Sequence, residues 1–112
     1  MVNQVSGARA SDPSELRRAV RELVDFGAKA ALRGVMHDLR VINISPLGLM
    51  GRIDADVQKG DRLIVELPHV RTLEAIVRWV EDGRIGTEFL SAVPPHDYGL
   101  MLVSMPRRQT AW

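Results

Sequence analysis

Cysteine is absent from the 112-residue chain, and aromatic residues are scarce, with two Phe, one Tyr and two Trp. The lack of Cys excludes disulfides, thiolate catalysis and Cys-ligated zinc. The formal net charge is only +1, so no general field attracts polyanions, and so few aromatic rings make a poor stacking platform for single-stranded nucleic acid. No apolar run approaches the roughly 18 residues of a membrane span, and the N-terminus has no signal-peptide core. We therefore expect a cytoplasmic protein that neither inserts into a membrane nor binds a nucleic acid polymer.

Side chains that could carry catalysis or hold a metal are also poorly placed. His37, His69 and His96 lack the spacing of metal ligands relative to one another. Asp54 and Asp56 lead into a turn, and no Ser–His or paired-carboxylate arrangement can be argued at that point. We therefore expect no enzyme activity, no metal and no cofactor.

Arginine is what the chain has in abundance, because thirteen of its 15 basic residues are Arg. The planar guanidinium fork matches phosphate groups and guanine edges, which the Lys ammonium does not. The length allows one domain with a modest core. We expect a flexible N-terminal lead-in over residues 1–15, the domain over 16–105 and a C-terminal tail over 106–112. A monomer or weak dimer is expected.

Residues 41–50 are predicted to form a strand, a tight turn and a second strand. Asn43 and Ser45 fall on one face of the first strand, and two isoleucines fall on the other. Pro46 presets φ for a turn, and Gly48 permits a positive φ or the close approach of another group. An ordinary β-turn would explain this segment by itself, but two polar side chains beside a glycine could also hold a ligand.

Apolar residues alternate with polar ones in most of the remaining chain, and Gly- or Pro-containing turns interrupt them every 8 to 12 residues. This pattern favours a small all-β barrel or sandwich, with strands over residues 22–32, 35–45, 48–54, 62–67, 73–79 and 85–89. In the fifth strand, Trp79 alternates with the apolar residues and Arg78 with the polar ones. A short helix is expected after Pro95, with Tyr98, Met101, Leu102 and Met105 forming its apolar stripe and Pro106 ending it.

Residues 12–26 fit two interpretations. Asp12 and Pro13 could begin a helix, with Leu16, Val20 and Leu23 recurring at helical spacing. From Glu22 onward, however, a period of two predicts a strand that continues to Leu32.

Two motifs give the chain a family resemblance. Arg17 and Arg21 form the pattern RxxxR ahead of the first strand, and Asn43, Ser45 and Gly48 form NxSxxG at the end of the second. In this order, and followed by alternating strands, they resemble the signature of the PilZ domain family over residues 16–104. The segment Ile85-Gly86-Thr87-Glu88-Phe89 is similar to the closing strand of that family. The resemblance implies a six-stranded antiparallel PilZ-type barrel of the Greek-key or split-barrel kind.

The resemblance also implies a function, which is binding of the bacterial second messenger cyclic di-GMP. Arg17 and Arg21 would then engage guanine edges and phosphates, with Arg18 as a third contact. Asn43 and Ser45 would supply neutral polar contacts. The family further implies that the segment holding the arginines is mobile and orders over the ligand, that residues 22–32 form the first strand, and that a downstream effector protein is the partner.

Two other functions stay open at this point. A ligand-free adaptor with the same fold would act by protein contact alone, and a small barrel that binds single-stranded nucleic acid would need aromatic rings that the chain has in short supply. Trp79 is expected in the core or the hairpin rather than beside a ligand. Arg78 is expected to be a solvated charge rather than part of a basic rim.

Overall fold

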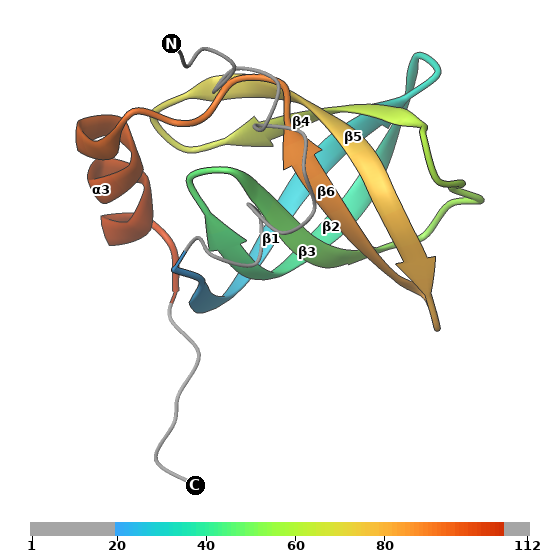
Figure 1. Ribbon diagram of the computed structural model, residues 1–112, viewed down its shortest axis with the longest axis horizontal. Coiled ribbons are helices and arrows are strands. Elements are labelled where there is room, and N and C mark those ends of the chain that lie inside the picture. Colours follow the sequence, from blue (N-terminus) through green and yellow to red (C-terminus); the bar gives the residue numbers. More distant parts are fainter. Residues whose placement is uncertain (1–19, 107–112) are drawn as a thin grey trace, which may run out of the picture.

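The computed structural model describes residues 20–106, which form a closed six-stranded barrel and a helix at one of its ends (Figure 1). The elements are β1 Glu22–Leu32, β2 Val35–Ser45, β3 Gly48–Ile53, β4 Arg62–Leu67, β5 Arg71–Glu81, β6 Arg84–Phe89 and α3 Pro95–Val103. The six-stranded antiparallel barrel with a short C-terminal helix is therefore confirmed.

Two three-stranded meanders build the barrel. Strands β1, β2 and β3 follow one another, as do β4, β5 and β6, and the seams β3–β6 and β1–β4 join the two meanders. Every strand pair is antiparallel. Closure gives each strand two neighbours, so the barrel has no free edge.

Apolar side chains at alternate strand positions fill the interior of the barrel. In β4, Leu63, Val65 and Leu67 are buried while the residues between them are exposed. In β1, Ala28 and Ala30 point inward and are buried. Alanine favours strands weakly, but small side chains suit the narrow interior of a six-stranded barrel, where large and small residues must alternate. The strand prediction for residues 22–32 is correct, and the helical interpretation is wrong from Glu22 onward.

Bulges change which face some residues occupy. In the β2–β3 ladder, Val41 lies opposite Gly51 and Asn43 lies opposite Met50, so Ile42 is an extra residue on β2. A bulge shifts the alternation by one. As a result Val41 and Ile44 are both buried in the core, and Asn43 faces outward. Strand β5 has a similar irregularity between Val77 and Trp79.

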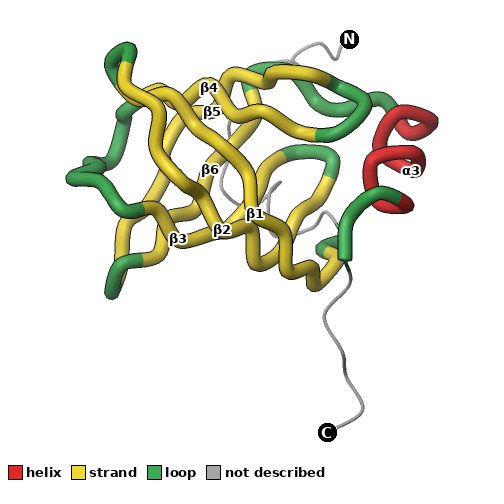
Figure 2. The backbone as a smooth tube through the Cα atoms, turned by 180° about the vertical axis from the view of Figure 1, so that it is seen from behind, coloured by secondary structure: helices red, strands yellow, loops and turns green. Residues whose placement is uncertain are grey.

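Helix α3 covers one end of the barrel, next to the turn between β2 and β3, and this neighbourhood is visible from both sides (Figures 1 and 2). The hydroxyl of Tyr98 donates to the carbonyl oxygen of Ile44 at 3.1 Å, and Met101 is fully buried. The helix ends at Val103, earlier than predicted. Met105 nevertheless packs into the core, from a turn in which its N–H bonds the carbonyl of Leu102.

Candidate functional site

The turn between β2 and β3 is fixed by its own hydrogen bonds. The Ser45 hydroxyl oxygen accepts from the N–H of Leu47 at 3.1 Å, which closes a local side-chain turn. The carbonyl oxygen of Leu47 accepts from the N–H of Phe89 at 2.8 Å, and that of Pro46 from the N–H of Val93 at 2.9 Å. The motif is thus tied to the chain that leaves β6, so its geometry does not depend on a ligand.

Gly48 is required by the contact between β3 and β6. It lies directly opposite Glu88, and a Cβ at this position would overlap the backbone carbonyl of Thr87. Its φ is not positive. Of the two reasons predicted for a glycine here, close approach is therefore the correct one.

A small outward-facing hollow brings the motif residues together. It has a volume of about 20 Å³ and is lined by Arg21, Asn43, Ser45, Gly48, Leu49, Met50, Trp79, Gly86 and Thr87. Arg21 is exposed, whereas Asn43 and Ser45 are largely covered, with 8% and 3% of their surface accessible. The Asn43 amide contacts the Met50 sulfur at 3.8 Å, a weak acceptor. We call this group of residues the motif hollow.

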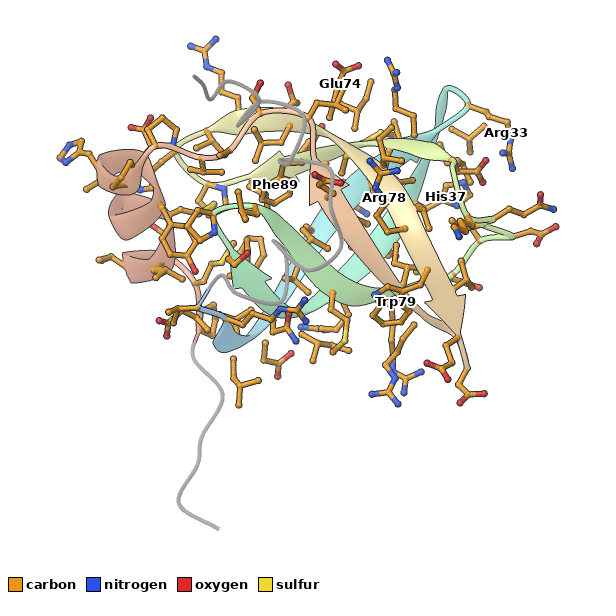
Figure 3. All side chains as sticks on the ribbon, in the orientation of Figure 1. Arg33, His37, Glu74, Arg78, Trp79 and Phe89 are labelled. Atoms are coloured by element: carbon orange, nitrogen blue, oxygen red, sulfur yellow. The ribbon has the colours of Figure 1, made fainter. Side chains whose placement is uncertain are left out.

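Trp79 belongs to the motif hollow. Of the two places expected for it, the core is wrong and the hairpin is correct, because Trp79 lies opposite Gly86 in the β5–β6 hairpin. The bulge in β5 turns the indole to the outer face (Figure 3), where the residue keeps 36% of its surface accessible. The ring packs over Gly86, where any Cβ would overlap the indole nitrogen. A planar aromatic surface therefore lies beside the polar motif residues.

Arg78 is not simply a solvated charge, contrary to prediction. Its Nε donates to the Glu88 carboxylate at 2.8 Å, and the two side chains keep 34% and 6% of their surface accessible. The pair lies at the edge of the motif, because Glu88 is the cross-strand neighbour of Gly48. Arg78 neutralises a buried carboxylate, which would otherwise be a costly isolated charge.

The predicted site residues divide into two groups. Arg21, Asn43, Ser45 and Gly48 line one hollow. Arg17 and Arg18 lie outside the described residues, as do the lead-in up to residue 15 and most of the predicted tail. Sequence reasoning missed Gly86 as a site residue. The signal that could have found it is its place opposite Trp79 in a hairpin, since a glycine there leaves room for an indole.

A larger hollow of about 700 Å³ lies elsewhere, over β1, β2 and β3. Its charged walls carry both signs, with Lys29, Arg40 and Arg52 facing Asp38, Asp54 and Glu66. Lys29 forms a hydrogen bond and ion pair with Asp38, which raises the pKa of Lys29 and lowers that of Asp38. Because the Lys29–Asp38 ion pair and two further carboxylates line this hollow, it suits an anion less well than the motif hollow does.

Within residues 20–106, no group of three or more His, Asp or Glu is arranged to hold a metal ion. In the same part of the chain, no helix is long and apolar enough to cross a membrane. The motif hollow offers a guanidinium, an amide, a hydroxyl and an indole, which are groups for binding a flat, anionic, hydrogen-bonding molecule.

The fold and the motif hollow define a small closed β-barrel that gathers polar side chains on the outside of its sheet. The sequence model of the PilZ domain family matches residues 15–102. The chain therefore belongs to the PilZ domain family, as its motifs predicted, and this is a family of binding domains that act as receptors for cyclic di-GMP. A search of curated proteins found no match.

Proposed function

We propose that this protein is a receptor for cyclic di-GMP, which binds across the motif hollow. The observation that supports this most strongly is the convergence of Arg21 with Asn43 and Ser45 beside an exposed Trp79. A ligand with two guanines and two phosphates requires charge, hydrogen-bonding groups and a stacking surface, and all three meet there.

Each side chain has a part in the proposed complex. The Arg21 fork donates either to guanine O6 and N7 or to phosphate oxygens. Asn43 offers an amide with only a weak partner, and Ser45 still has a hydroxyl hydrogen to donate because its oxygen serves as acceptor in the turn. The outer face of Trp79 stacks on a guanine ring.

The size of the motif hollow decides how the ligand lies. A volume of about 20 Å³ holds little more than a single water molecule, so the nucleotide rests on the surface of the barrel. Its outer side is then free for Arg17 and Arg18. We expect residues 9–21 to order over the bound ligand and to create a new surface for a downstream effector protein. Amide hydrogen exchange should slow in residues 9–21 on adding ligand, and unchanged exchange there would contradict the relay.

Calorimetric titration with cyclic di-GMP tests the receptor function. Micromolar binding corresponds to about 8 kcal/mol, and we expect Arg21→Ala to weaken it by at least about tenfold. Arg62→Ala is the matched control, because Arg62 is an exposed strand arginine that pairs with Glu74 on another side of the barrel. A native chain that binds no cyclic di-GMP would contradict the receptor function; absence of oligonucleotide binding as well would then favour the ligand-free adaptor.

Trp79 supplies an optical readout of the same event. The chain has two Trp residues, so Trp112→Phe leaves Trp79 as the single indole. Its emission should change on adding cyclic di-GMP. Trp79→Ala should weaken binding by about 1–3 kcal/mol, the usual value for stacking on one base. An unchanged affinity in Trp79→Ala would remove the indole from the proposed site.

A further inference from the structure

Three arginines form a row across the outer face of the barrel, beyond the motif hollow. Arg40 on β2 lies directly opposite Arg52 on β3, and Arg52 lies directly opposite Arg84 on β6. All three are exposed. We call them the arginine row. It lies toward the β5–β6 turn, at the end of the barrel away from α3 (Figure 1).

The sign of the charges makes this row unusual. Directly opposed like charges on adjacent strands destabilise a sheet, whereas opposite charges stabilise it. Another row on the same barrel follows the favourable rule, because Asp38, Lys29 and Glu66 lie opposite one another on β2, β1 and β4. The arginine row therefore lowers the stability of the sheet and brings no benefit to the fold.

Counter-charges within the described residues do not neutralise the arginine row. Arg40 donates to Asp25 at 2.9 Å. Arg52 and Arg84 form no ion pair or hydrogen bond with any side chain of residues 20–106, although Glu81 lies directly opposite Arg84. Two guanidinium groups thus remain available for an external partner.

The surroundings of the arginine row favour a protein partner over a small anion. A hollow of about 370 Å³ adjoins the row, and its wall includes the half-buried Ile42. Each of the three strands has a neighbour on both sides, so their backbone N–H groups serve the barrel and do not form the backbone nest typical of phosphate sites. Arginine is enriched at the surfaces through which proteins contact one another.

The spacing points to one kind of segment. Adjacent strands lie about 4.8 Å apart, which is close to the roughly 5–6 Å between side chains at positions i and i+3 or i+4 of a helix. We propose that the arginine row docks an acidic helix of a partner protein, whose successive carboxylates meet Arg84, Arg52 and Arg40, the last through guanidinium N–H groups that are not used by Asp25. The surface exists before cyclic di-GMP binds, so this docking does not depend on the proposed receptor function.

A pair of synthetic peptides tests the proposal. The probe is a labelled Ala-rich helical peptide with Glu at positions i, i+4 and i+7, and the matched control has Gln at the same positions. Fluorescence anisotropy of the full chain in low salt should show binding of the Glu peptide and at least about tenfold weaker binding of the Gln peptide. Binding should also weaken as salt screens the charges.

Variants locate the peptide on the barrel. Arg52→Glu should reduce affinity for the Glu peptide by at least about tenfold and should favour a peptide with Lys at the three positions. Arg62→Glu, a change of the same charge on β4, should leave affinity unchanged.

Both variants should retain cyclic di-GMP binding if the receptor proposal is correct, so the two proposals can fail separately. Equal binding by Arg52→Glu and the native chain, or displacement of the peptide by an equal concentration of pyrophosphate, would overturn the acidic-helix assignment.

Discussion

The two sides of the barrel treat polar groups differently. On the side of the barrel around β1, β4 and β5, the charged side chains form ion pairs: Lys29 on β1 pairs with Asp38 at the border with β2, and Arg62 on β4 pairs with Glu74 on β5. Over β2, β3 and β6, Arg52 and Arg84 have no ion-pair partner among residues 20–106, and Asn43 has only a weak one. The charges on the first side are thus satisfied by partners within the barrel. The second side combines polar groups that lack strong partners with glycines that allow close approach of a backbone strand at Gly48 and of an indole ring at Gly86. Both proposals above depend on this combination.

The largest expected effect comes from filling the space at Gly48. Gly48→Val would push side-chain atoms into the backbone of Thr87, and overpacking against a backbone that cannot move should cost more than about 3 kcal/mol. We expect a variant that does not fold. Gly27→Val is the control on the other side, since a Cβ there meets only the Arg40 guanidinium at 3.9 Å. Circular dichroism and thermal melting distinguish them, and a stable Gly48→Val would contradict our account of the β3–β6 contact.

The second largest change in the free energy of unfolding is expected on removal of Arg78. Arg78→Met leaves the buried Glu88 carboxylate without its partner, and the free energy of unfolding should fall by about 3 kcal/mol, the low end for buried pairs because Arg78 is partly hydrated. Arg62→Met breaks an exposed pair and should change it by less than about 1 kcal/mol. Urea unfolding measures both. An equal loss in the free energy of unfolding in Arg78→Met and Arg62→Met would mean that the buried Glu88 carboxylate does not need Arg78 to stay charged in the folded protein.

A smaller effect of opposite sign is expected in the arginine row. Arg52→Gln removes the central like charge, so the free energy of unfolding should rise by about 0.5 kcal/mol in low salt, and the gain should shrink as salt increases. Lys29→Gln, the corresponding change in the row of alternating charges, should lower stability. A loss of stability in Arg52→Gln would remove the argument that the row is kept for a partner.

The smallest effect concerns pH. The Lys29 hydrogen bond lowers the pKa of Asp38 from its ordinary value of 3.8. The folded pKa is thus below the unfolded one, so the stabilisation is present above the unfolded pKa and is lost as pH falls through the folded pKa. Both side chains are exposed to solvent, so the change in the free energy of unfolding should be slight. Unfolding measurements between about pH 5 and 2 should show a small loss in the free energy of unfolding. This loss should be absent in Asp38→Asn and present in Asp54→Asn.

The sequence was sufficient to predict most of the strands and the proximity of four of the six motif residues. Alternation and turn residues act over a few positions, so β4 followed directly from the sequence, whereas the start of β1 also fitted a helix and was assigned to a strand by the family resemblance. The motifs further predicted that Arg21 lies near Asn43, Ser45 and Gly48, and these four residues line one hollow. The binding role of these residues remains a prediction that titration must test.

The bulges could not be predicted, because they depend on the partner strand. Uninterrupted alternation puts Trp79 in the core with Val77, whereas the extra residue in β5 turns it outward. The partner of Arg78 is equally invisible in sequence, since Glu88 lies on another strand and becomes buried only when the barrel closes. Both features require pairing between strands, which no single segment specifies.

If the receptor proposal is correct, the contact between Trp79 and Gly86 has a consequence for the affinity for cyclic di-GMP. Because the indole rests on bare backbone, its torsions are restricted before any base arrives, and immobilising it on binding costs little rotational freedom. A preorganised ring of this kind lets a shallow surface retain a flat molecule without enclosing it. A bulkier residue at position 86 would tilt the ring away, and the loss would show mainly as faster dissociation of the nucleotide.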